Sequence, residues 1–560
     1  MKTFSFLSLS LPLVLQFSAE VEAGRRPFHS QGYVPVVTLR NGTVSGRYSP
    51  EYAQDFFLGI PYAQPPVGNL RFRPPQFLNT KRNVDASEYG NWCYGTGRES
   101  RGKPMSEDCL TLNVVRPVNI NQFAKLPVAV WIHGGSWAGG SGARDTYNMS
   151  SLVQQSVQMG TPIIAITINY RLGVWGFLGG REIAGTRNAN NGLKDQRLAL
   201  HWIQENIRAF GGDPFRVTIF GESAGGASVN WHQLAWGGRN DGLFQRAILQ
   251  SGTGMMTPIT WPHTFQSTFE SLATYTACAD ETDRLQCMRN ANESTIWAWA
   301  QATPHYVSPM LDGDMIPEFA SKLIKDGKFV KVPTIVGHNS DDGTSFTPTG
   351  NRAVNDEAQL ISVMKTLFEI NDNLANEIAT HYHSAISIPP AESYAGVPLP
   401  SNIGSLFFRT SAIMTDHTFT APRRMFAQEL TSRNVPVWSY RFKCVSNGYP
   451  AHLGATHFTE IVYVLHNTDL WDPFSASYPM NGPDRADYVA LSKMMARTWI
   501  KFFITGNPNG AAGLPHWPQY GSEANEMVFD KGAGNTVVGQ DDYRSVGIQW
   551  FINKSPRLNR

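Results

Sequence analysis

The chain has 560 residues, of which 42% are hydrophobic and 16% charged, and its formal net charge is +2. Average soluble proteins carry about 25% charged residues. This composition excludes an intrinsically disordered chain, and the balanced charge gives no indication of a nucleic-acid or anionic-membrane partner. The 50 glycines and 35 prolines suggest a loop-rich globular protein, and the five cysteines are an odd number that needs explaining.

The first residues have the pattern of a secretory signal peptide. Lys2 precedes an apolar stretch, 4–17, that is too short to span a bilayer as a mature helix. Val21-Glu22-Ala23 then fits the small-x-small cleavage rule. The alternative, a buried N-terminal helix, is disfavoured by the polar segment that follows. We therefore expect a signal peptide at 1–23 and a secreted protein, which would allow N-glycosylation at four sequons: Asn41, Asn148, Asn292 and Asn553.

Beyond this segment, apolar runs alternate with helical patterns. Asn41-Gly42 favours a type I′ turn and predicts a hairpin over 36–48. Runs typical of strands buried on both faces of a parallel sheet cover residues 126–133, 162–170, 217–220, 332–337 and 435–442. A helical pattern covers 193–210, and 344–432 is expected to be a largely helical insertion. The alternation predicts the α/β class, with one domain over 24–560 rather than several.

The sequence Gly221-Glu222-Ser223-Ala224-Gly225 follows a predicted strand and precedes a helix-compatible run. This is the context of a nucleophile elbow, in which a serine sits on a sharp turn between small neighbours. A structural glycine-rich turn is the alternative. We expect Ser223 to be a nucleophile. It would need a general base to activate it and hydrogen-bond donors for the oxyanion that its attack creates.

The expected oxyanion donors lie in the loop that follows the run 126–133. Its sequence, His133-Gly134-Gly135-Ser136-Trp137, lets the backbone approach a reacting group closely. The backbone N–H groups of Gly135 and Ser136, together with that of Ala224, are the predicted oxyanion hole.

Three longer motifs resemble the type-B carboxylesterase/lipase family: SEDCLTLNV (106–114), NYRLGVWGFL (169–178) and GGDPFRVTIFGESAGG (211–226). A fourth, 59–75, extends the resemblance over nearly the whole mature chain. The family includes cholinesterases and fungal lipases. The resemblance implies an α/β-hydrolase fold, with a mostly parallel central sheet flanked by helices, and a serine hydrolase that cleaves carboxylic esters through an acyl-enzyme without metal or cofactor.

The resemblance also orders the triad as serine, acid, histidine. Asp342 occupies the position before Gly343 where most members of the family carry glutamate, and Asp341 is the alternative acid. Aspartate is one methylene shorter, so either the loop moves inward or the hydrogen bond lengthens. His457, in Gly-x-x-His-x-x-Glu-Ile, is the predicted base and His452 the alternative. In the resemblance Glu222 and Glu460 support the site from behind, although both could be merely packed polar groups.

Four cysteines match disulfide loops of the family, Cys93 with Cys109 and Cys278 with Cys287, which leaves Cys444 free. Sequence alone would allow three pairings of these four residues. The resemblance further places buried ion pairs between Arg71 and Glu107 and between Arg171 and Asp213.

The substrate is expected to be a small-molecule ester. The loop between Cys93 and Cys109 is short and polar, unlike the amphipathic lid of true lipases, and offers only Tyr94 to a choline-like cation. Five residues line the acyl side of the pocket or belong to the core: Trp231, Trp236, Met255, Met256 and Trp261. The alternatives are an interfacial lipase or sterol esterase and a non-catalytic adhesion protein, which the intact triad disfavours. No nucleic-acid partner or stable membrane insertion is expected, and the oligomeric state is open.

Overall fold

The computed structural model describes residues 32–303, 305–383, 397–471, 477–532 and 534–560, so the expected signal peptide lies outside the described residues. A sheet of 11 strands forms its centre. In spatial order the strands are β16 (Val537–Gln540), β15 (Asn525–Phe529), β14 (Val437–Phe442), β13 (Thr334–Asn339), β12 (Arg246–Gln250), β11 (Gly212–Glu222), β9 (Leu126–Ile132), β10 (Ile164–Ile168), β8 (Thr111–Pro117), β4 (Gln54–Pro61) and β3 (Arg47–Ser49).

The middle of this sheet is parallel and its edges are antiparallel. The seven strands from β10 to β15 pair in parallel, whereas β8, β4, β3 and β16 pair antiparallel to their neighbours. All five apolar runs predicted as strands belong to the parallel part. The predicted hairpin is β1 (Val36–Leu39) with β2 (Gly42–Ser45), and β5 (Val84–Asp85) extends it into a small second sheet. A third pairing joins β6 (Trp92–Cys93) and β7 (Met105–Ser106).

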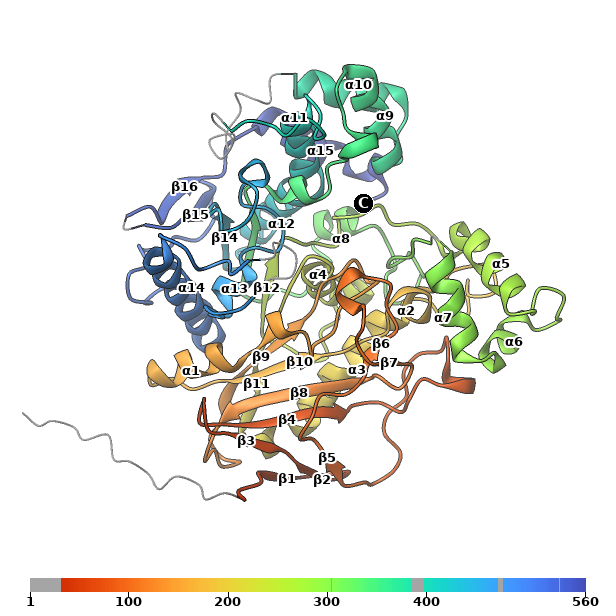
Figure 1. Ribbon diagram of the computed structural model, residues 1–560, viewed down its shortest axis with the longest axis vertical. Helices are drawn as coiled ribbons and strands as arrows, with labels where there is room; N and C mark the ends of the chain where they lie inside the picture. The colour runs from red at the N-terminus through yellow and green to blue at the C-terminus, as the bar shows by residue number, and fades with distance from the viewer. Residues whose placement is uncertain (1–31, 304, 384–396, 472–476, 533) are drawn as a thin grey trace, which may run out of the picture.

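Helices cover both faces of the central sheet (Figure 1). In β9, Val128 and Val130 face a core shared with α3 (Asn191–Asn206) and α4 (Ala224–Gly238). The intervening Ala129 and Trp131 face a second core with α1 (Ser150–Gln158) and α14 (Arg485–Thr505). Both faces of the strand are therefore buried, which is why its sequence is continuously apolar. The α/β-hydrolase class expected from the sequence is confirmed.

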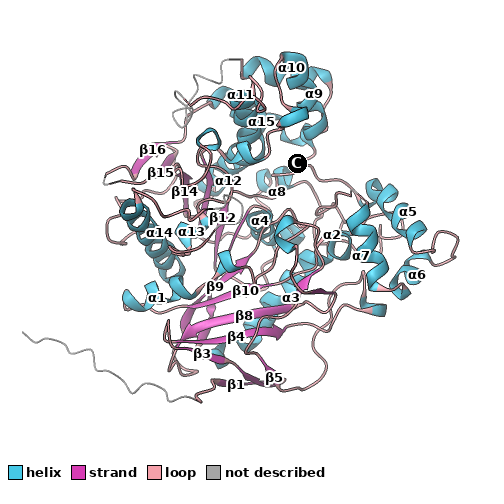
Figure 2. Cartoon of the chain, in the orientation of Figure 1, coloured by secondary structure: helices cyan, strands magenta, loops and turns pink. Residues whose placement is uncertain are grey.

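The remaining helices belong mostly to excursions between strands (Figure 2). They are α2 (Gly173–Phe177), α5 (Gln266–Tyr275), α6 (Arg284–Asn290), α7 (Glu293–Ala302), α8 (Ala320–Lys325), α9 (Glu357–Phe368), α10 (Asp372–His381), α11 (Phe407–Thr415), α12 (Ala421–Ser432), α13 (Ile461–Val464) and α15 (Ser545–Lys554). The described parts of segment 344–432 consist of helices joined by irregular stretches, as expected. Between α11 and α12 the chain forms a π-helix, Asp416–Thr420.

Candidate active site

Ser223 sits at the junction between β11 and α4 with a strained backbone, φ 57° and ψ −127°. Glycines flank it because nothing larger fits. A Cβ on Gly225 would lie 2.0 Å from the carbonyl oxygen of Ile132, and one on Gly221 would lie 2.5 Å from the same atom. The backbone N–H of Ser223 donates to the Gln250 carbonyl at 2.9 Å, which fixes the turn to the neighbouring strand. The serine is thus held in a conformation that is normally unfavourable for a residue with a side chain.

The loop after β9 lies beside this turn. A Cβ on Gly134 would be 3.1 Å from the Cβ of Ser223, so the backbone of the loop approaches the serine closely. Across the described chain, the N–H groups of Gly135, Ser136 and Ala224 donate to no other protein group. Ala224 also begins α4, where the helix dipole places partial positive charge. These three donors remain available to a developing negative charge.

His457 contacts Asp342 directly. Its Nδ1 lies 2.6 Å from Oδ1 of Asp342, so the shorter aspartate does not lengthen the hydrogen bond. The other carboxylate oxygen of Asp342 accepts from the Ser251 hydroxyl at 3.0 Å and from the Asn339 N–H at 2.8 Å. Asp342 itself begins a short 3₁₀ turn, Asp342–Ser345, whose Gly343 N–H donates to the Thr415 hydroxyl at 2.9 Å. Ser251 after β12, Asn339 of β13 and Thr415 of α11 therefore hold Asp342 and its turn in place.

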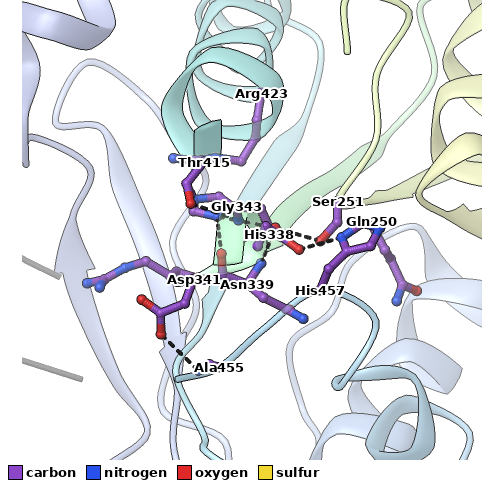
Figure 3. Close-up of polar contacts among 12 residues, drawn as sticks. Gln250, Ser251, His338, Asn339, Asp341, Gly343, Thr415, Arg423, Ala455 and His457 are labelled. Atoms are coloured by element: carbon purple, nitrogen blue, oxygen red, sulfur yellow. Dashed lines mark hydrogen bonds and ion pairs between the residues drawn. The ribbon is translucent and has the colours of Figure 1, made fainter. Parts of the chain in front are cut away.

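Asp341 and His452, the alternatives to Asp342 and His457, make other contacts. Asp341 points toward Ala455 rather than His457 (Figure 3) and accepts its N–H at 2.8 Å. A Cβ on Gly454 would collide with the same carboxylate, 2.2 Å from its Oδ2. Asp341 thus supports the segment that leads into His457. His452 packs edge-on against Phe407, with ring centroids 5.7 Å apart.

Glu222 faces the other nitrogen of the histidine. Its Oε1 lies 3.1 Å from Nε2 of His457, and this Nε2 has no hydrogen-bond partner among the described residues. Glu460 lies behind, where it accepts from the Asn339 amide at 2.7 Å and from the Gln250 amide at 3.3 Å. Two buried carboxylates, besides Asp342, therefore surround the imidazole.

This cluster shifts the protonation of its members. Burial favours neutral His457, but the charges of Glu222 and Asp342 outweigh it and raise the pKa of His457 to about 9. Burial raises the pKa of Glu222 well above the usual carboxyl value, against the opposing charge of His457. Burial and Asp342 together raise the pKa of Glu460 to about 7. The cluster therefore retains protons to a higher pH than isolated groups of the same kinds.

Aromatic rings enclose His457, and sequence reasoning did not find them. Phe346 meets the imidazole edge-on at 4.9 Å and Phe419, from the π-helix, lies at 5.0 Å. Phe346 is 40% exposed, so one wall of the site opens to solvent. Ser251 and Asn339 were also missed. Phe346 lies only four residues after Asp342 and could have been suspected, whereas nothing local marks Phe419.

The structure contains both expected disulfides, Cys93–Cys109 and Cys278–Cys287, and a buried free Cys444. Arg71 and Glu107 form the expected buried ion pair at 2.6 Å.

The expected partner of Arg171 was wrong. Arg171 pairs with Asp195 of α3, whose carboxylate accepts from its backbone N–H and from two guanidinium nitrogens at 2.6–3.0 Å. Asp213 instead accepts the N–H of Phe215 at 3.0 Å, within the irregular start of β11.

The residues expected to line the acyl side of the pocket differ in burial and in contacts. Trp231 and Met255 are fully buried in the core, and Met256 is buried beside them. Trp236 donates to Asp314 at 3.0 Å and is covered by Arg239, 4.5 Å from its ring.

Two further aromatic residues of the region differ in exposure. Trp261 is half exposed. Tyr94 stacks on Trp175, with centroids 5.1 Å apart, and lies 5.2 Å from Trp297, so indoles occupy its faces.

Among the described residues, no group of three or more His, Cys, Asp or Glu side chains is arranged to hold a metal ion. No helix in the same part of the chain combines the length and hydropathy that crossing a bilayer requires.

Comparisons with known proteins identify the family and agree with the fold. The profile of the Carboxylesterase family matches residues 33–544. Lipase 4 of Diutina rugosa is 32% identical over 98% of this chain and 99% of its own length. Secreted lipase 1 of Botryotinia fuckeliana is 30% identical over 96% of this chain and 97% of its own. The crystal structure of Aspergillus niger EstA superposes with a TM-score of 0.82 at 28% identity, covering 95% of this chain and all of EstA.

Proposed function

The chain belongs to the carboxylesterase family and is a carboxylic ester hydrolase, and we propose that Ser223, His457 and Asp342 form its catalytic triad. The observation that carries the assignment is the 2.6 Å contact between His457 and Asp342, made beside a strained serine at a strand-to-helix turn. Catalytic hydrogen bonds are often long or misaligned without substrate, so the missing bond from Nε2 is compatible with this role.

The reaction follows from these positions. His457 accepts the proton of Ser223 as the hydroxyl attacks the ester carbonyl, and Asp342 orients the imidazole and stabilises its charged form. The N–H groups of Gly135, Ser136 and Ala224 bind the oxyanion. His457 then protonates the leaving alcohol and activates water to hydrolyse the acyl-enzyme. The carboxylate of Glu222, which faces Nε2, and that of Glu460, which lies behind, raise the proton affinity of the imidazole.

The preferred substrate is a soluble ester rather than a lipid aggregate. The loop between Cys93 and Cys109 is tied to the oxyanion loop, because Thr96 donates its N–H to the Ala138 carbonyl at 2.8 Å. A Cβ on Gly135 would lie 2.8 Å from the Glu99 carboxylate, so the two loops are in close contact. A short polar loop fastened in this way offers no apolar lid to a lipid surface. The lipases among the relatives keep the interfacial alternative open to test.

We also propose that the protein is secreted, with 1–23 removed as a signal peptide and 24–560 forming one hydrolase domain. Support comes from the apolar N-terminal pattern, from the two disulfides and from the similarity to a lipase named as secreted.

Labelling and kinetics test this function together. A fluorophosphonate should label Ser223 in the purified protein, and Ser223→Ala should abolish labelling and nearly all hydrolysis while the protein still folds. An acyl-chain series on soluble esters, run beside emulsified triglyceride, distinguishes the two substrate classes. Wild-type hydrolysis by the alanine variant would refute the mechanism, and higher rates on emulsion than on dissolved ester would refute the substrate class.

A further inference from the structure

Strands β1 and β2 lie at the end of the molecule opposite α9, α10 and α11 (Figure 1). Two adjoining hollows lie beside the turn between them. The first has a volume of about 370 Å³ and is lined by Asn41, Phe77 and Trp202 among others. The second, of about 400 Å³, shares Arg40 and Glu205 with it. Each is within the size range of small-ligand sites, roughly 300–1,000 Å³. Neither is used by the proposed reaction.

The walls of the first hollow combine apolar faces with a polar rim. Leu198, Trp202 and Glu205 are spaced i, i+4 and i+7 on one face of α3. Phe77, which lines the same hollow, is 58% exposed, whereas Leu198 and Trp202 are each only 6% exposed, so Phe77 supplies the apolar face that is open to a ligand. Glu205 and Arg40 supply charged hydrogen-bonding groups at the edge. A saccharide ring, with an apolar C–H face and a rim of hydroxyls, matches this combination.

Hydrogen bonds hold the hollow in shape. The Asn41 carbonyl accepts the N–H of Arg82 at 2.9 Å, which fastens the β-turn to the segment that follows Phe77. Gln64 donates its side-chain amide to the Phe77 carbonyl at 2.8 Å. A site that is already ordered loses little conformational entropy when it is occupied.

Asn41 lies at the lip of this hollow and begins the sequon Asn41-Gly42-Thr43. Its side-chain amide makes no hydrogen bond within the described part of the chain. The other three sequon asparagines are each bonded through Oδ1, Asn148 to Ser150, Asn292 to Ser294 and Asn553 to Gln549. Because the sugar is attached to Nδ2, which these Oδ1 contacts do not occupy, the feature that distinguishes Asn41 is its place in the lining of the hollow beside Phe77.

We propose that Asn41 carries an N-linked glycan whose first sugars pack in this hollow against the exposed Phe77. The inference rests on the proposed secretion, because only an exported chain meets the modifying enzyme. In the transfer, the Asn41 amide nitrogen bonds to the anomeric carbon of an oligosaccharide carried on a lipid pyrophosphate. The lipid pyrophosphate leaves and the amide loses one proton. Attachment at the lip then keeps the sugars at a high effective concentration beside the aromatic walls.

Glycopeptide mass spectrometry of the protein secreted by a eukaryotic host is the first test. We expect Asn41 to be occupied, and Asn41→Gln to remove that glycan alone. A secreted, active enzyme with an unmodified Asn41 overturns the inference and leaves the proposed function standing. A protein retained in the cell with its first 23 residues intact overturns both the inference and the proposed secretion, which N-terminal sequencing distinguishes.

The second test asks whether the glycan packs. Endoglycosidase H should trim the Asn41 glycan several-fold faster in Phe77→Ala than in the parent, with Phe123→Ala, an exposed phenylalanine of the second hollow, as the matched control. Phe77→Ala should also lower Tm by about 2 °C in the glycosylated protein and by much less in Asn41→Gln. Equal trimming rates together with equal Tm losses would overturn the packing.

Discussion

Asp342 reaches Nδ1 of His457 at 2.6 Å while the adjacent Asp341 is turned away and accepts the N–H of Ala455 at 2.8 Å. Two consecutive aspartates on one loop thus have separate tasks. One contacts the imidazole, and the other supports the segment that delivers it. Sequence reasoning favoured Asp342 but could assign no task to Asp341.

This division predicts different outcomes for two isosteric changes. Asp342→Asn should lower kcat by about 10⁴-fold, because the amide cannot stabilise the charged imidazole and favours the wrong tautomer. Asp341→Asn keeps a side-chain oxygen that can accept the Ala455 N–H, so its kcat should fall by less than about 10-fold. Steady-state kinetics on a soluble ester, with circular dichroism to check folding, measures both. Comparable losses in the two variants would contradict the assignment.

The carboxylate of Glu222, 3.1 Å from Nε2 of His457, predicts a change in the pH dependence of hydrolysis. His457 must be neutral to accept the serine proton, so its pKa of about 9 places the rising limb of kcat/KM in the alkaline range. Glu222→Gln removes a negative charge that favours imidazolium. The rising limb of kcat/KM should therefore move to lower pH. Activity near pH 6, relative to the maximum of each profile, should rise even if the maximal kcat/KM falls.

Glu460→Gln is the matched control for that profile, because Glu460 is also a buried carboxylate but bonds to Asn339 and Gln250 rather than to the imidazole. In Glu460→Gln the rising limb of kcat/KM should also move to lower pH, but by a smaller amount. A Glu222→Gln profile that coincides with the parent would show that Glu222 is already protonated in the resting enzyme, contrary to this prediction.

The packing around the serine predicts that Gly225 tolerates no side chain. A Cβ there would lie 2.0 Å from the carbonyl oxygen of Ile132, a backbone atom at the end of β9 that cannot turn away as a flexible side chain could. Gly225→Ala should destabilise the fold by about 3 kcal/mol or more and abolish labelling at Ser223. Chemical denaturation and fluorophosphonate labelling measure this. Gly539→Ala, where a Cβ would meet only the Val528 side chain at 3.3 Å, is the control and should be close to neutral.

The sequence predicted what is encoded locally. The turn around Ser223 could be recognised because each flanking position has its own steric requirement within five residues. Five of the seven parallel strands could be recognised because burial on both faces leaves a continuous apolar run, whereas β12 and β15 were missed. Phe419 could not be found, since it reaches His457 only through a π-helix inside a long helical excursion. The antiparallel strands β8, β4 and β3 on one side of the sheet were missed because their segments were not distinguished as apolar runs.

The buried ion pair of Arg171 gives the last prediction. The resemblance gave Arg171 only Asp213 as a partner, whereas in the folded structure α3 places Asp195 against the arginine. Asp195→Asn should lower the free energy of unfolding by about 3–5 kcal/mol, because it leaves a buried guanidinium without a counter-charge. Asp213→Asn should change it by less than about 0.5 kcal/mol, because the asparagine oxygen can still accept the Phe215 N–H. Urea denaturation of both variants measures the difference, and a larger loss for Asp213→Asn would restore the partner expected from the sequence.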